Sequence, residues 1–118
     1  MYDHIGLKVK DLAKSKAFYN AVLGALGHAL AYDEPDCAGF GAGVGTFWLY
    51  PSATPVAGVH IAFSARDAAA VKRFHDAGIA AGGRDNGPPG PRPDYGPTYH
   101  AAFLYDPDGN NVEAVVVR

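Results

Sequence analysis

Two histidines and one glutamate are the residues of this chain whose types and positions could hold a metal ion. His4 and His60 each begin a short segment in which polar and apolar residues alternate, and Glu113 interrupts an apolar segment near the end of the sequence. Imidazole nitrogens and carboxylate oxygens are common ligands of divalent transition metals, and a set of three leaves coordination positions open for a substrate. These residues therefore indicate a metal centre that could act as a Lewis acid, if the fold brings them together.

The alternation in these segments predicts which way the three side chains point. A period of two residues is typical of a half-buried strand, with the apolar face against the core. The first, third and fifth residues after each histidine are apolar, and so are the immediate neighbours of Glu113. We therefore expect all three side chains on the open faces of strands predicted over His4–Lys10, Val59–Ala65 and Asn111–Val117.

The elements that position these residues are duplicated. The segment His4–Gly27 resembles His60–Gly83, with His-Ile, Asp, Lys and Phe repeated at a constant offset of 56 residues. Two copies of a unit of this length divide the chain into modules of about 1–55 and 56–118. The repeat predicts a single domain that carries the first two candidate ligands at equivalent places.

Each module is predicted to have the order βαβββ, which places the chain in the α+β class. Asp11 and Asp67 stand where helix N-caps would be, and the helices are expected to end near Leu26 and near Ala77, the latter at Gly78. The other strands predicted in the first module are His28–Asp33, Ala38–Ala42 and Thr46–Tyr50, and Tyr99–Tyr105 is predicted in the second. The Gly/Pro-rich stretch 86–98 reads as a long loop that follows the start of the remaining strand.

Composition excludes several classes of partner. The formal net charge is −2, and no run of Lys and Arg forms a stripe that could follow a phosphate backbone, so nucleic acid is not expected. No apolar segment is long enough to span a bilayer. Cys37 is the single cysteine, which together with the absence of a leader-like N-terminus predicts a cytoplasmic protein.

Several further residues could take part in binding or proton transfer. Trp48, Tyr50 and Phe103 are candidate walls of a substrate cavity, and Arg92 could meet an anionic group. Tyr99 and His100 are the candidate acid–base groups. A small-molecule substrate is the partner that this set predicts.

Three segments of the sequence resemble the vicinal oxygen chelate superfamily, which includes glyoxalase I, bleomycin-resistance proteins and extradiol dioxygenases. They are YDHIGLKVKDL at the start, GVHIAFSARD in the middle and FLYDPDGNNVEAV near the end. The resemblance implies that paired modules form curved mixed sheets around a metal cup, with helices outside, commonly in a homodimer. It also implies that His4, His60 and Glu113 hold one divalent ion (Zn, Mn, Fe or Ni), which a substrate chelates through vicinal oxygens for lyase, isomerase or transferase chemistry.

One departure from the family pattern narrows the expected activity. Glyoxalase I adds a carboxylate ligand on the last strand of the first module, near Trp48 in this chain, but no Asp, Glu, His or Gln lies between Gly39 and Val59. A three-ligand site resembles the fosfomycin-resistance or dioxygenase branches more, so glyoxalase I activity is not expected. Two alternatives stay open: an iron(II) extradiol dioxygenase, and a non-catalytic protein that sequesters a ligand, as the bleomycin-resistance branch does.

Overall fold

The structure, a computed structural model, describes residues 1–43 and 46–118. The first module consists of β1 (His4–Val9), α1 (Leu12–Ala25), β2 (Leu30–Glu34), β3 (Cys37–Phe40) and β4 (Thr46–Pro51). The second consists of β5 (His60–Ser64), α2 (Ala68–Ala80), β6 (Arg84–Pro91), β7 (Tyr99–Tyr105) and β8 (Asn111–Val117). The predicted α+β class and the duplicated βαβββ order are confirmed.

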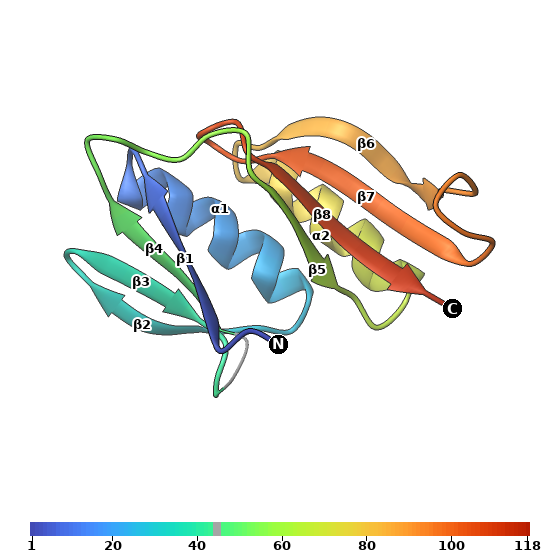
Figure 1. Cartoon of the computed structure of the whole chain (residues 1–118), viewed down its shortest axis with the longest axis horizontal. Helices are drawn as coiled ribbons and strands as arrows, with labels where there is room; N and C mark the ends of the chain where they lie inside the picture. Colours follow the sequence, from blue (N-terminus) through green and yellow to red (C-terminus); the bar gives the residue numbers. More distant parts are fainter. Residues whose placement is uncertain (44–45) are drawn as a thin grey trace.

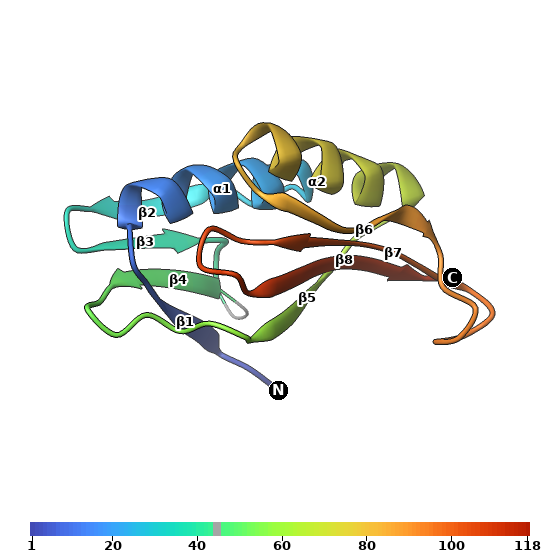
Figure 2. The ribbon, with the colours of Figure 1, turned by 90° about the horizontal axis from the view of Figure 1, so that it is seen from above.

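Each module forms a four-stranded mixed sheet. Sheet A has the strand order β1-β4-β3-β2, and sheet B has the order β5-β8-β7-β6. In both sheets the first strand pairs in parallel with the last strand of its module, and the other pairs are antiparallel. The sheets lie side by side, and both helices cover the same side of them (Figures 1 and 2). The opposite, open faces carry the candidate ligands.

Both helices begin at the predicted aspartates. The Asp11 carboxylate accepts a hydrogen bond from the Lys14 amide at 3.1 Å, and Asp67 accepts one from the Ala70 amide at 2.8 Å. Each bond satisfies an amide that has no partner within the first helical turn. The two caps fix where each helix begins, shortly after the first strand of its module.

The predicted end of the second helix at Gly78 is wrong, because α2 continues to Ala80. Gly78 lies inside the helix, where a Cβ atom would stand only 2.2 Å from Cδ1 of Leu104 and 2.9 Å from Cγ1 of Val22. The residue is therefore a close-packing position between α2, β7 and α1. The helix ends before Gly82, whose φ of +94° suits glycine.

The Gly/Pro-rich stretch was expected to be mostly loop, but β6 extends through it to Pro91. This strand is at the edge of sheet B and pairs only with β7. Its prolines cannot donate a backbone hydrogen bond, but an edge strand has no neighbour on its outer side that would need one. Its register with β7 shifts between Asp85 and Gly87 and again between Gly87 and Gly90. The actual loop is therefore shorter and covers residues 92–98.

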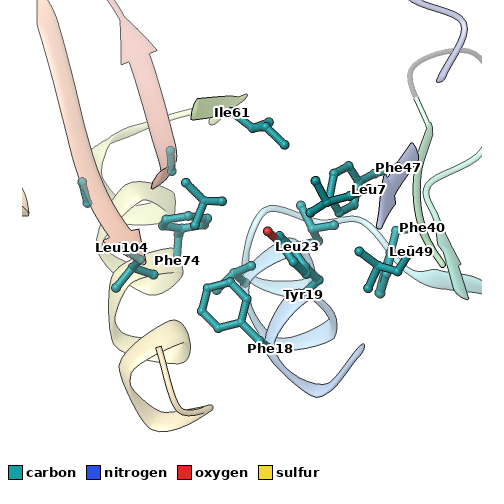
Figure 3. Packing of buried hydrophobic residues seen from close by; sticks show 14 of the residues in the cluster. Leu7, Phe18, Tyr19, Leu23, Phe40, Phe47, Leu49, Ile61, Phe74 and Leu104 are labelled. Carbon is teal, nitrogen blue, oxygen red and sulfur yellow. The ribbon is translucent and has the colours of Figure 1, made fainter. Parts of the chain in front are cut away.

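One hydrophobic core joins the two modules. Buried residues of α1, including Phe18 and Tyr19, lie between the two sheets and α2, and Figure 3 shows them between Phe74 and Leu104 on one side and Leu49 on the other. The Tyr19 hydroxyl donates to the buried Asp106 carboxylate of the other module at 2.6 Å. Within the described residues, neither helix is long and apolar enough to cross a membrane.

Candidate functional site

His60 and Glu113 lie in contact on the open face of sheet B. Nε2 of His60 is 3.0 Å from Oε1 of Glu113, across the parallel pair of β5 and β8. The Glu113 side chain is only 2 % exposed, whereas that of His60 is 49 % exposed. A carboxylate this deeply buried is costly unless a cation or hydrogen-bond donors compensate it, so this pair is the focus of the candidate site.

The contact of the other ring nitrogen of His60, Nδ1, bears on where the imidazole carries its proton. Nδ1 lies 3.2 Å from the main-chain oxygen of Asn111, which only accepts hydrogen bonds, so we assign the tautomer of the neutral ring that carries its proton on Nδ1. Nε2 then directs its lone pair at the Glu113 carboxylate, which is also an acceptor. A proton or a metal cation between the two atoms resolves this conflict.

Tyr99 on β7 completes the surroundings of the carboxylate. Its hydroxyl donates to Oε2 of Glu113, the oxygen that His60 does not face. Partial burial, followed by the hydrogen bond to Glu113 and the charge of that residue, raises the pKa of Tyr99 to about 12. Tyr99 is therefore a neutral phenol near pH 7 and is suited to donate a hydrogen bond rather than to act as a base.

Phe103 and Arg92 form a wall beside His60. The Phe103 ring is stacked near the imidazole, with a centroid distance of 6.3 Å and an interplanar angle of 22°. The Arg92 guanidinium lies 5.4 Å from the Phe103 centroid. It donates to the main-chain oxygens of Pro88 at 2.6 Å, Gly90 at 3.0 Å and Pro91 at 3.3 Å. The guanidinium predicted to bind an anion is thus occupied with the backbone of β6.

Sequence reasoning missed two residues of this site. Tyr95, in the loop after β6, packs edge-on against Tyr99 with a centroid distance of 5.2 Å. Both tyrosines line a cavity of about 380 Å³ together with His60, Phe103, Asn111 and Glu113. The Asn111 side chain accepts a hydrogen bond from Asn86 at 3.1 Å. Tyr95 is an exposed aromatic residue in a Gly/Pro-rich segment, and that was the available signal.

His4 lies elsewhere, on the open face of sheet A. Its Nδ1 is 2.7 Å from the Asp3 carboxylate, and its side chain is 57 % exposed. It lines a different cavity, of about 530 Å³, which also includes the predicted substrate residues Trp48 and Tyr50. In the parts of the chain that the structure describes, no three His, Cys, Asp or Glu side chains lie close enough together to hold one ion. One chain therefore brings together two of the three predicted ligands.

His100 lies on the opposite face of β7 from the candidate site. In the regular pairing of β7 with β8, Tyr99 and Phe103 share the face of Glu113, and His100 shares the face of the buried Ala102 and Leu104. That face is covered by α2 (Figure 2). The structure thus brings Tyr99 to the carboxylate and leaves the other predicted acid–base residue on the opposite side.

Comparisons with known proteins agree with this architecture. The family model of the Glyoxalase/Bleomycin resistance protein/Dioxygenase superfamily matches residues 2–114. Among solved structures, a glyoxalase/bleomycin resistance protein from Albidiferax ferrireducens is 34% identical, with a TM-score of 0.87 and 98% of each chain covered. No curated protein matches this chain.

Two more distant structures share the fold. A glyoxalase/bleomycin resistance protein/dioxygenase family enzyme from Burkholderia phytofirmans is 20% identical, with a TM-score of 0.76 and 98% of each chain covered. A variant of glyoxalase I from Zea mays is 26% identical, with a TM-score of 0.70, over 95% of this chain and 44% of that one. With the match over nearly the whole length, the chain belongs to the glyoxalase/bleomycin resistance protein/dioxygenase superfamily.

Proposed function

We propose that this protein is a metal-dependent enzyme acting on a small substrate that chelates a divalent ion through two neighbouring oxygens. The observation that carries the proposal is the contact between His60 and the buried Glu113. Two acceptor atoms directed at each other need a cation between them, and a metal ion supplies one without requiring either group to be protonated. Metal binding at such a pair releases protons, which makes it dependent on pH.

The geometry of the donors suits one shared ion. Ligand atoms about 2.0–2.2 Å from a divalent ion stand roughly 3.0 Å apart at octahedral angles and roughly 3.4 Å apart at tetrahedral ones, and the separation of the His60 and Glu113 atoms is 3.0 Å. Metal-binding histidines usually donate their other ring N–H to a carbonyl or a carboxylate. Nδ1 of His60 faces the Asn111 carbonyl and Nδ1 of His4 faces the Asp3 carboxylate, so each histidine offers Nε2 as the ligand.

A second copy of the chain would supply the third ligand. His4 and the His60–Glu113 pair lie on the open faces of different sheets, which stand side by side in one chain (Figure 1). A twofold dimer that places sheet A of one copy over sheet B of the other would close the cup twice, because a twofold interface is self-complementary. Each site would then hold His4 from one copy with His60 and Glu113 from its partner.

Within such a cup, the ion would supply Lewis acidity to an oxyanion that develops on the substrate, in lyase, isomerase or transferase chemistry. The residues of this chain have separate tasks. Tyr99 keeps the Glu113 carboxylate oriented through its hydrogen bond, and Phe103 restricts the plane of the His60 ring. The rings of Tyr95 and Phe103 give the cavity its apolar lining.

Metal analysis of protein purified without chelator tests the proposal. We expect about one divalent ion per chain in the wild type and a loss of that ion in His60→Ala and in Glu113→Ala. The matched control is His28→Ala, which removes an exposed histidine outside both cavities that hold the candidate ligands. Protein that holds no ion after loading with Zn, Mn, Fe or Ni would contradict the proposal and favour ligand sequestration.

Oxygen consumption separates the proposed chemistry from the dioxygenase alternative. Two histidines and one carboxylate can also hold iron(II) with room for oxygen and a catechol. Iron-loaded protein that consumes oxygen with a panel of catechols would establish the alternative. If iron-loaded protein consumes no oxygen, the lyase, isomerase or transferase chemistry proposed above is favoured.

A further inference from the structure

The indole ring of Trp48 lies flat on bare backbone in sheet A. A Cβ atom added to Gly39 would stand 2.6 Å from Cζ3 of the indole and 2.8 Å from both Cε3 and Cη2. These separations are too short for any side chain, so glycine at this position allows the ring to rest on β3. The ring is also fixed in its plane, because Nε1 donates to the Thr46 hydroxyl at 3.0 Å.

Other aromatic rings continue this surface. The Tyr32 ring is tilted at 56° to the indole with a centroid distance of 5.5 Å. A Cβ atom at Gly6 would stand 3.1 Å from Cε2 of Tyr50, so a second glycine leaves room for a second ring on the sheet. The three rings line the cavity of about 530 Å³ whose border carries His4. The indole is only half-buried and borders that cavity, while one of its faces is against Gly39.

We propose that the sheet-A cavity binds a planar aromatic or heteroaromatic ring of the substrate, stacked on Trp48. This inference rests on the proposed function, because a ring in this place would direct its substituents toward His4 and the ion. A rigid, flat, apolar face favours a flat partner, since offset stacking adds to the burial of area. The indole is already held by Thr46 and Gly39, so little side-chain freedom is lost when a ligand binds.

Trp48 is the only tryptophan of the chain, so its indole N–H gives one signal in a nitrogen–proton NMR spectrum. The probes are 2-naphthol and decahydro-2-naphthol, which share a carbon skeleton and a hydroxyl group but differ in planarity. The protein is first treated with chelator, so the readout does not depend on a metal. We expect 2-naphthol to shift the indole signal saturably and the saturated analogue to bind at least severalfold more weakly.

Variants connect the binding to the proposed surface. Trp48→Leu should weaken 2-naphthol binding, measured by calorimetry, by about 3–10-fold. Gly39→Ala should displace the indole and weaken binding similarly, whereas Gly24→Ala is a matched control, because a Cβ there meets nothing within 4 Å. Equal binding of both probes, or full binding by folded Trp48→Leu protein, would overturn the inference. The double variant His60→Ala, Glu113→Ala should lose metal yet keep this binding, so the two proposals can fail separately.

Discussion

Trp48 and Glu113 occupy equivalent positions in the two sheets. Trp48 pairs with Gly6, two residues after His4, and Glu113 pairs with Ala62, two residues after His60. The duplicated halves therefore present different chemistry at one topological position: an aromatic floor in sheet A and a buried carboxylate in sheet B. A cup made from one sheet of each kind would combine a metal site with an apolar surface beside it.

The hydrogen bond from Tyr99 to Glu113 is expected to support metal binding. Tyr99→Phe removes a donor from a buried carboxylate and leaves its orientation to His60 alone. Loss of such a supporting partner typically lowers metal affinity by about 10–100-fold. Competition with a chromophoric chelator measures the change.

Tyr105→Phe is the matched control for this prediction. Tyr105 lies on the same face of β7, and among the described residues its hydroxyl makes no hydrogen bond. The metal affinity of Tyr105→Phe protein should equal that of the wild type. Equal affinities for the wild type and Tyr99→Phe would show that Glu113 does not need the phenol.

Arg92 is expected to stabilise β6 rather than to bind an anion. Its guanidinium donates to three main-chain oxygens of β6, two of them from prolines, and lies over Phe103. Arg92→Ala should reduce the free energy of unfolding by about 1–3 kcal/mol, because these carbonyls lose a charged donor. Urea unfolding measures this, and amide exchange of residues 84–98 locates the change.

Arg92→Lys tests whether the planar guanidinium group, with its several donors, is needed for this stabilisation. Lysine keeps the charge but cannot reach several oxygens in one plane, so it should recover only part of the stability. Arg66→Ala, which removes an exposed arginine, is the control. An Arg92→Ala protein with unchanged stability and weakened binding of anionic ligands would restore the substrate-binding role for this residue.

The contact between His75 of α2 and Asp85 of β6 predicts a dependence of stability on pH. Nε2 of His75 lies 2.7 Å from Oδ1 of Asp85. This hydrogen bond, followed by that from the Gly87 amide, lowers the pKa of Asp85 below its usual value. Because the folded state favours the charged carboxylate, the contribution is complete above the unfolded pKa of about 4 and disappears as the pH falls through the lowered value.

Urea unfolding at pH 7 and at about pH 2.5 checks this sign. The wild type should lose more stability than Asp85→Asn over this interval. Asp94→Asn, which alters an exposed carboxylate of the loop, should behave like the wild type. A loss in Asp85→Asn equal to that in the wild type would show that the contact does not contribute.

The fold was largely predictable because local signals and the repeat agree. Asp11 and Asp67 cap their helices as expected, and the alternation around Glu113 predicts the face that it shares with His60, where the two side chains are in contact. The end of α2 was not predictable, since Gly78 serves close packing against Leu104, which a single sequence does not reveal. The length of β6 was missed because an edge strand tolerates prolines that an inner strand would not.

The site was predictable only in part. Residue types and alternation were enough to place His60 and Glu113 on one open face, because both lie on strands with clear apolar faces. Tyr99 and His100 are adjacent on β7, so alternation places their side chains on opposite faces of the sheet. Both residue types can transfer protons, so residue type alone does not show which of the two lies beside Glu113. The position of His4 relative to the other two candidate ligands depends on how the sheets are placed, and no local pattern encodes that placement.

A complementation experiment tests most directly the proposal that two copies of the chain share a metal site. His4→Ala protein and His60→Ala, Glu113→Ala protein are produced with different tags, alone and together, and the mixed dimer is isolated through both tags. If the ligands come from two copies, each variant alone binds no metal at this site, whereas the mixed dimer recovers one ion per dimer. If they came from a single chain, no subunit of the mixed dimer would hold a full set. A mixed dimer without metal, beside a wild type with about two ions per dimer, would show that the ligands do not come from two copies.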